Sequence, residues 1–204
     1  MAGIDTPSAA WGRVPTLHGR HATLEPLAAG HADGLRAALG DGALSQLWYA
    51  NVPAPAAVDE YIAKALAARE AGTALPFVVR DRAGAIAGST RFYDLQPSVP
   101  SLKIGYTWYA PQVQRSGVNS EAKLLLLGHA FETLECASVS FETSWFNHAS
   151  RAAIARLGAK QDGVLRAHKR HADGSLRDTV VFSILAAEWP AAKRHLQFRL
   201  ESHS

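Results

Sequence analysis

Residues 102–109 carry the feature that most restricts how this chain can fold. Every second side chain in the segment is apolar or aromatic: Leu102, Ile104, Tyr106 and Trp108. This period of two predicts a β-strand that buries these side chains on one face. A polar loop at 110–117 follows, and then a segment at 119–134 whose apolar residues recur at helical spacing. A strand that leads through a loop into an amphipathic helix predicts a mixed α/β fold.

The rest of the chain continues the mixed pattern. Further strands are expected at 21–27, 75–80, 85–93, 139–143, 164–168 and 179–185, and further helices at 31–39, 57–69, 148–157 and 191–200. Polar, glycine-containing links at 81–84 and 172–175 predict hairpins. The sequence has no internal repeat and no linker-like stretch, so it predicts one domain.

Length and composition agree with a single globular domain. The chain has 204 residues, of which 48% are hydrophobic, enough for a core without disulfides or metals. We expect a flexible leader at 1–10 and the domain at 11–204. Cys136 is the only cysteine, which excludes an intramolecular disulfide and fits the cytoplasm. No apolar run reaches the roughly 20 residues of a membrane span. The net charge of +3 is scattered along the chain, so we expect neither a membrane nor a nucleic-acid partner.

The loop before the expected helix at 119–134 is a candidate anion site. It reads Gln114-Arg115-Ser116-Gly117-Val118-Asn119-Ser120. A helix N-terminus leaves backbone N–H groups without partners and carries the positive end of the helix dipole, so it favours phosphate. Gly117 lets the backbone come close to an anion. Such loops are common, however, and Asn119 or Ser120 can equally serve as an N-cap.

Three separated motifs resemble those of a known family. Gln114-x-x-Gly117-x-Asn119 is similar to the Gln/Arg-x-x-Gly-x-Gly/Ala pyrophosphate loop of GNAT acetyltransferases, with Asn119 departing from the family's Gly or Ala. Residues 104–108 stand where the family has the preceding strand. Asn147-His148-Ala149-Ser150, followed by Leu157-Gly158-Ala159, resembles its second cofactor motif. Over nearly its whole length the chain resembles the RimJ/RimL branch, whose members acetylate protein N-termini or small amines.

The resemblance implies both a fold and a reaction. The fold is a single GNAT-type domain: a central, mostly antiparallel, twisted sheet of about six to seven strands, flanked by helices, with a splayed parallel pair at the acetyl-CoA site. The reaction moves an acetyl group from acetyl-CoA directly to a primary amine, within a ternary complex. Acetyl-CoA is the implied cosubstrate, and no metal is implied.

The resemblance also implies the cofactor contacts. Residues Gln114 to Ser120 are expected to contact the pyrophosphate. The edge of the strand that ends at Trp108 and Tyr109 is expected to pair with the pantetheine amides, and Asn147 to bind the cofactor arm. Ser150 matches a serine that protonates the departing thiolate. Alternatively, its hydroxyl satisfies a backbone group in the first turn of a helix.

The sequence evidence for the general base and for the acceptor pocket is weaker than that for the cofactor site. Glu142, on its short strand, is a candidate base, or it lies on a solvated strand face. Asp94 is a second candidate, although an aspartate here also fits a turn. Trp48, Tyr49 and Tyr93 are candidate walls of the acceptor pocket, because aromatic faces bind an alkyl ammonium. Core packing is the competing use of these rings.

Two other functions fit the same sequence. One is a non-catalytic acyl-CoA sensor or interaction module, since no base stands out. The other is a nucleotide- or phosphate-binding domain that shares only the loop. The apolar side of the segment at 191–200 further predicts a homodimer contact.

Overall fold

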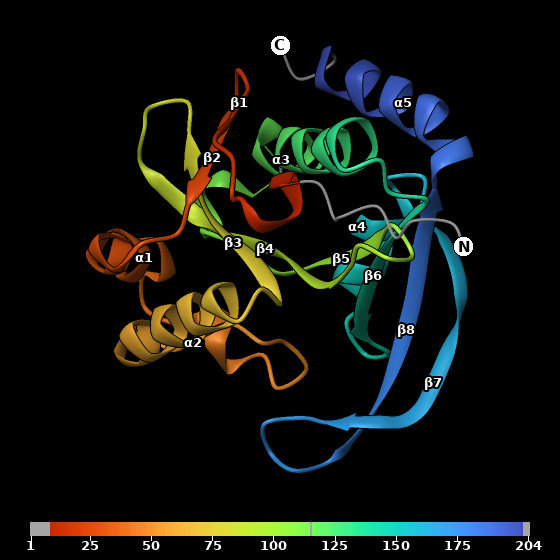
Figure 1. The fold of residues 1–204 in the computed structure, drawn as a ribbon. Helices are drawn as coiled ribbons and strands as arrows, with labels where there is room; N and C mark the ends of the chain where they lie inside the picture. Colours follow the sequence, from red (N-terminus) through yellow and green to blue (C-terminus); the bar gives the residue numbers. More distant parts are fainter. Residues whose placement is uncertain (1–8, 115, 202–204) are drawn as a thin grey trace.

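A computed structural model describes residues 9–114 and 116–201, and these form one mixed α/β domain (Figure 1). Eight strands make one sheet in the order β1-β2-β3-β4-β5-β6-β8-β7. Their bounds are β1 Leu17–His18, β2 Ala22–Pro26, β3 Ala74–Asp81, β4 Ile86–Gln96, β5 Ser101–Tyr109, β6 Ser138–Ser144, β7 Lys160–Arg170 and β8 Leu176–Leu185. The expected fold class is confirmed. The additional strand, β1, has only two residues, too few to show alternation.

Helices cover both faces of the sheet (Figure 1). The α-helices are α1 Ala32–Leu39, α2 Val58–Glu70, α3 Gly117–Gly128, α4 His148–Ala155 and α5 Trp189–Glu201. Short 3-10 helices lie at Ala9–Gly12, Ala29–His31, Ala43–Gln46, Pro55–Ala57, Pro111–Val113 and Ala186–Glu188, and a π-helical turn at His129–Thr133 extends α3. One buried cluster lies under α1 and α2, and a larger one lies under α3 and α5. We call these two sides of the sheet the α1–α2 face and the α3 face.

The strands β5 and β6 form the parallel pair of the described sheet. Their ladder joins Ser101–Lys103 to Ser138–Ser140 and then stops, although β5 continues to Tyr109 and β6 to Ser144. The two strands therefore diverge toward their C-terminal ends. The divergence leaves one edge of residues 104–109 without a partner strand on the β6 side. The splayed parallel pair expected from the resemblance is thus present in the sheet.

A β-bulge in β5 changes which side chains share a face. Tyr106 has a φ of 52°, and the pairing with β4 shifts between residues 89 and 91. Leu102 and Ile104 pack in the cluster on the α3 face, whereas Trp108 packs on the α1–α2 face. The expectation that all four alternating residues share one buried face is wrong, because an additional residue reverses the alternation.

The ends of several elements differ from the expected ones. Helix α3 begins at Gly117, two residues before the expected start, and the expected leader at 1–10 overlaps a 3-10 helix that buries Trp11. Residues 1–8 lie outside the described range.

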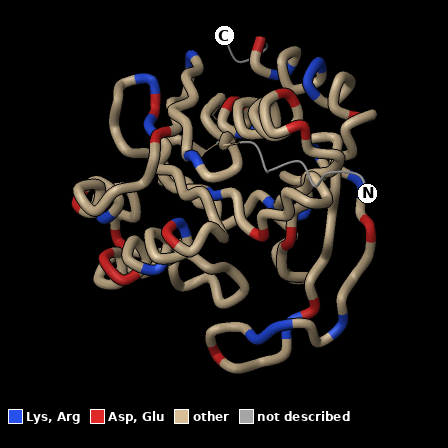
Figure 2. The backbone as a smooth tube through the Cα atoms, viewed as in Figure 1, with Lys and Arg blue, Asp and Glu red and all other residues tan. Residues whose placement is uncertain are grey.

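Lys and Arg are interspersed with Asp and Glu along the chain (Figure 2). No described helix has the length and apolar character needed to cross a bilayer. The homodimer contact through α5 stays a prediction, and Phe198 there is exposed.

Gly88 holds β4 close to the end of β5. An alanine Cβ at this position would lie 2.1 Å from the Trp108 carbonyl oxygen, and Gly88 has a φ of 155°. We expect Gly88→Ala to lower the free energy of unfolding by about 3 kcal/mol or more, measured by urea denaturation. Gly163→Ala is the matched control, because no heavy atom beyond its chain neighbours lies within 4 Å of its added carbon. Equal stability of the two variants would show that β4 and β5 can separate without cost.

Candidate active site

The N-terminus of α3 is built as an N-cap. The Ser116 hydroxyl accepts a hydrogen bond from the Val118 N–H at 3.3 Å, and the Ser116 N–H donates to the Val113 carbonyl at 3.3 Å. The cap is therefore Ser116, and the two candidates named from the sequence, Asn119 and Ser120, lie inside the first turn. The first turn of a helix carries the positive end of the dipole and directs its N–H groups outward along the axis.

A cavity of about 260 Å³ lies against this helix end. Helix α3 contributes Ser116, Asn119 and Ser120 to its wall, and the segment of α4 and the residues after it contribute Ala153, Arg156 and Leu157. Helix α5 adds Leu196 and Arg199. The cavity thus combines a helix N-terminus, hydroxyl and amide side chains, and two arginines. This is the chemistry that favours a phosphate group.

The other residues of the candidate loop differ in their surroundings. Gly117 is buried, and a Cβ there would lie 2.7 Å from the His21 ring, so this glycine permits close packing of α3 on β2. Val118 is also buried in the core. Gln114 is exposed, and its side-chain amide donates to the Tyr109 carbonyl at 3.4 Å. Arg115 lies outside the described residues. Of the described loop residues, Ser116, Asn119 and Ser120 therefore line the cavity.

Glu121 fixes α3 against the turn between β1 and β2. Its carboxylate accepts hydrogen bonds from the backbone N–H groups of Arg20, His21 and Ala22, at 2.9 Å from Arg20 and 2.7 Å from Ala22. The side chain is buried, so these bonds replace the water that a carboxylate otherwise needs. Sequence analysis missed this residue, because its partners lie about 100 positions earlier.

The two residues at the end of β5 point in opposite directions. Trp108 packs on the α1–α2 face and Tyr109 on the α3 face. The Tyr109 hydroxyl is enclosed and has no hydrogen-bond partner among the described residues, and burial raises its pKa. Both side chains pack against a face of the sheet, so any contact with a cofactor at the strand edge would come from the backbone of these two residues.

Asn147 caps helix α4. Its side-chain oxygen accepts a hydrogen bond from the Ser150 N–H at 3.0 Å. This bond gives the capping role to Asn147, whereas sequence analysis had offered Ser150 as a residue that satisfies a backbone group. The Ser150 hydroxyl makes no hydrogen bond to another described residue and is partly exposed. It is consequently available to a ligand.

Glu142 is held between two lysines. Lys103 Nζ lies 2.6 Å from one carboxylate oxygen, and Lys169 Nζ lies 2.7 Å from the other. Burial acts to raise the pKa of Glu142, but the hydrogen bonds from both lysines outweigh it and lower the pKa. Asp94 also pairs with Lys103, at 2.9 Å. A carboxylate of lowered pKa is a weak base, so the geometry favours an ion-pair role for Glu142.

Lys123 is a buried amine that sequence analysis did not consider. It is 6% exposed, and its Nζ donates to the Thr107 hydroxyl at 2.9 Å. Thr107 follows the bulge residue Tyr106 and also shares a hydrogen bond with Thr90 at 2.7 Å. Burial lowers the pKa of Lys123 to about 7, because the charged form loses its hydration. The bulge therefore has a titratable amine on its α3 side.

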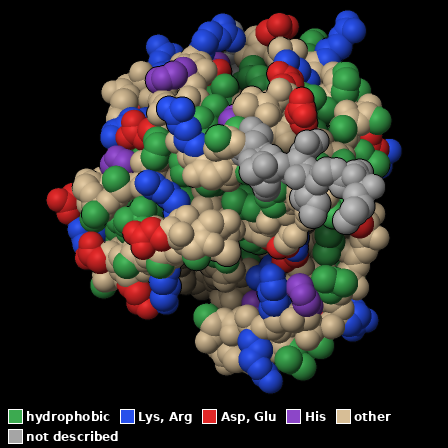
Figure 3. Space-filling view, in the orientation of Figure 1, with side chains coloured by type: hydrophobic (Ala, Val, Ile, Leu, Met, Phe, Trp, Pro, Cys, Tyr) green, Lys and Arg blue, Asp and Glu red, His purple; other side chains and the backbone are tan. Residues whose placement is uncertain are grey.

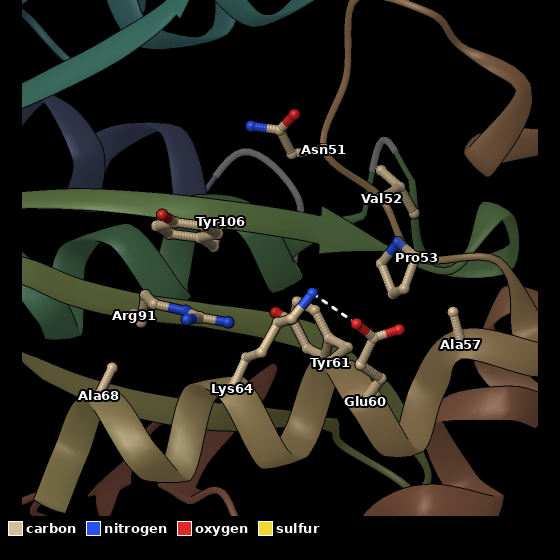
Figure 4. A pocket seen from close by; sticks show the side chains of 10 residues that line it. All are labelled: Asn51, Val52, Pro53, Ala57, Glu60, Tyr61, Lys64, Ala68, Arg91 and Tyr106. Carbon is tan, nitrogen blue, oxygen red and sulfur yellow. Dashed lines mark ion pairs between the residues drawn. The ribbon is translucent and has the colours of Figure 1, made fainter. Parts of the chain in front are cut away.

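A second cavity, of about 420 Å³, opens on the α1–α2 face of the bulge (Figure 4). Tyr106 and Arg91 contribute to it from the sheet, and Tyr61 and Lys64 contribute from α2. Its wall also includes residues 51–53, from the loop before α2. The peptide bonds of β5 thus separate a cavity on the α1–α2 face from the α3 face, where the helix N-terminus lies.

The three aromatic residues predicted for an acceptor pocket do not line this cavity. Trp48 contacts Tyr49 and also the His171 ring, with ring centres 5.6 Å and 4.7 Å apart. Tyr93 contacts Tyr106 edge-on, with ring centres 5.3 Å apart. Figure 3 shows the surface hollowed between the α1–α2 side and the tip of the β7–β8 hairpin. The edge-to-face contact between Trp48 and His171 connects the loop before α2 to that hairpin.

Comparison with known proteins identifies the family. A family model described as "Acetyltransferase (GNAT) domain" matches residues 21–160, more than half of the chain. The chain belongs to the GNAT acetyltransferase family. This confirms the prediction made from the loop and strand motifs.

Relatives of the GNAT domain agree in fold. A crystal structure of a GCN5-related N-acetyltransferase from Brucella melitensis is 31% identical, has a TM-score of 0.84, and is matched over 92% of this chain and 86% of that one. RimJ of Mycobacterium smegmatis in complex with CoA-disulfide is 22% identical, with a TM-score of 0.79 over 92% of this chain and 96% of that one. At that identity the likeness concerns the fold.

One curated relative matches part of the chain. It is named "Putative ribosomal N-acetyltransferase YdaF" and comes from Bacillus subtilis (strain 168). The identity is 30% over 110 residues, which are 54% of this chain and 59% of the length of that protein. The matched region is therefore less than two thirds of the length of that protein.

Proposed function

We propose that this GNAT domain is an N-acetyltransferase that binds acetyl-CoA and passes the acetyl group to a primary amine. The observation that carries the proposal is the cavity at the start of α3, which the C-terminal part of α4 and helix α5 also line. In the proposal, the diphosphate lies at Ser116, Asn119 and Ser120. The pantetheine then extends along the free edge of β5, whose backbone groups have no partner strand there.

We further propose that the amine enters from the opposite face. The cavity of about 420 Å³ reaches the β5 bulge at Tyr106, and no part of it overlaps the walls of the α3-side cavity. Two separate entrances suit a ternary complex, in which both substrates are bound before reaction. The amine nitrogen attacks the thioester carbonyl carbon, the carbon–sulfur bond breaks, and the nitrogen loses a proton while the thiolate gains one.

The proton that reaches sulfur requires a donor, for which we propose Ser150. Its hydroxyl is free of other described residues, and the Asn147 cap fixes the backbone that carries it. Loss of the proton from the amine through Glu142 is less favourable, because the two lysines lower the Glu142 pKa. Water in the acceptor cavity is therefore the better route for this proton.

A non-catalytic acyl-CoA sensor is the second candidate function. The ion-paired state of Glu142 favours it, since the described residues offer no carboxylate base at the bulge. The curated relative named as a putative ribosomal N-acetyltransferase, by contrast, supports a protein N-terminus or another amine as acceptor. We propose the cytoplasm as the compartment, where acetyl-CoA and ribosomal proteins are both present.

One experiment separates these functions. The melting temperature is measured with acetyl-CoA and with ATP, and thiol release is then followed with a panel of amines. The proposal expects stabilisation by acetyl-CoA and amine-dependent thiol release. Stabilisation without thiol release would support the sensor, and preferential stabilisation by ATP would contradict both functions.

Ser150→Ala tests the proposed acid. We expect kcat to fall by about 100-fold while the affinity for acetyl-CoA stays within about twofold, measured by steady-state kinetics and calorimetry. Asn147→Ala is the control for helix capping, and we expect it to lower the free energy of unfolding by about 1 kcal/mol. If Ser150→Ala lowers stability and leaves kcat unchanged, Ser150 is a structural residue.

A further inference from the structure

The cavity on the α1–α2 face contains a buried cation that lacks an anionic partner. Arg91 is 6% exposed, and its Nε is enclosed without a hydrogen bond. Among the residues that the structure describes, none forms an ion pair or hydrogen bond with its guanidinium. Burial of an unpaired charge is costly, so this arrangement requires a compensating group.

Aromatic rings supply only part of that compensation. Arg91 Cζ lies 4.0 Å from the centre of the Tyr106 ring and 5.1 Å from that of Tyr61. Figure 4 shows the guanidinium extending toward the cavity between β5 and α2. The ring faces attract the cation but accept no in-plane hydrogen bonds, so no described residue accepts a hydrogen bond from the guanidinium.

The nearby carboxylates are engaged by other cations. Glu60 at the cavity rim pairs with Lys64 at 2.6 Å, and both side chains are largely exposed. Glu142 is bonded to Lys103 and Lys169. Neither carboxylate is therefore available to neutralise Arg91.

A second buried arginine adds to the positive charge. Arg177 is 8% exposed, its Nε has no described hydrogen-bond partner, and its electrostatic neighbours are Glu142, Tyr93 and Tyr106. Arg177 does not line the cavity, but both arginines lie near Tyr106, and no described carboxylate forms a hydrogen bond with either. Such a site disfavours an acceptor whose only charge is positive.

We infer that Arg91 binds a carboxylate of the acceptor, so that the substrate is a primary amine with an acid group close to it. This inference rests on the proposed function. A planar guanidinium matches a carboxylate through two parallel hydrogen bonds, and stacking on Tyr106 fixes its plane. A free amino acid and a peptide whose first residues are acidic both present this chemistry.

Matched acceptors test the inference in the wild-type protein. Glutamate is compared with glutamine amide, and a Ser-Glu peptide amide with a Ser-Gln peptide amide, by thiol release from acetyl-CoA. We expect kcat/KM to be roughly 10- to 100-fold higher for the carboxylate member of at least one pair. The pair that shows the preference distinguishes an amino acid from a peptide. Equal values within both pairs would overturn the inference but leave the proposed function intact.

Variants assign the preference to Arg91. Arg91→Met is expected to reduce the preference to less than about threefold, and Arg91→Lys to restore part of it, with unchanged affinity for coenzyme A. Arg69→Met is the matched control, because Arg69 is an exposed cation on α2 outside the cavity. If Arg91→Met keeps the preference for the carboxylate acceptor, another residue causes the preference and the role inferred for Arg91 is wrong. If Arg91→Met does not fold, the wild-type pairs and Arg91→Lys still decide. Failure of every amine, together with failure to bind coenzyme A, would instead reject the proposed function.

Discussion

Ser120→Glu is expected to raise the dissociation constant of coenzyme A by at least about 100-fold. Ser120 lines the cavity at the first turn of α3, where we propose that the diphosphate binds. A carboxylate at this position lies beside the like-charged diphosphate. Repulsion at a few ångströms near a protein surface costs about 3 kcal/mol or more, which corresponds to that change in affinity. Isothermal titration calorimetry measures it directly.

Two control variants make the result specific to charge in the cavity. Ser120→Ala removes the hydroxyl without adding charge, and we expect it to weaken binding by less than about tenfold. Ser98→Glu adds the same charge at an exposed turn outside the cavity and is expected to leave the affinity unchanged. Equal, small effects of Ser120→Glu and Ser98→Glu would contradict a diphosphate site at the start of α3.

Lys123→Met is expected to stabilise the fold by about 2–5 kcal/mol at pH 6–7. Lys123 is buried, and its folded pKa of about 7 lies well below the ordinary value of 10.5. Each unit of that shift corresponds to about 1.4 kcal/mol against the charged form. Methionine fills a similar volume without charge, and Thr107 keeps its hydrogen bond to Thr90. Urea denaturation gives the two free energies of unfolding.

The pH dependence of this difference has a defined sign. Between pH 7 and 10.5 the unfolded chain keeps the Lys123 proton that the folded chain has lost, so wild-type stability rises with pH in this window. The methionine variant lacks this contribution. Its advantage over wild type should thus be greatest at or below pH 7 and decline toward pH 10. Parallel stability curves for the two proteins would show that Lys123 is hydrated in the folded state.

Local patterns predicted much of the fold. The segments 21–27, 31–39 and 57–69 became β2, α1 and α2 with small shifts at their ends, because alternation and helical spacing report burial of one face. The bulge at Tyr106 could not be predicted in this way. The alternation of apolar residues runs unbroken through β5, and only the pairing with β4 shows the additional residue that reverses the faces.

The candidate site, like the fold, could be predicted from the sequence only in part. The loop and the Asn147 motif were found because each lies in one short segment. The start of α3 lines the cavity, whereas Asn147 caps the N-terminus of α4, and the segment lines the cavity from Ala153 onward. Arg91 and Lys123 were not found. Each is one charged residue in an otherwise ordinary strand or helix, and it becomes notable only because segments far away in the sequence enclose it.

The central claim is that the backbone at the start of α3 binds the diphosphate of acetyl-CoA. The most direct measurement is a crystal structure of the protein with coenzyme A. We predict that the diphosphate occupies the cavity beside Asn119 and Ser120, with backbone N–H groups of the first helical turn donating to it at about 2.7–3.2 Å. A complex in which those groups bond to the protein itself, with the diphosphate bound at another place, would contradict the account.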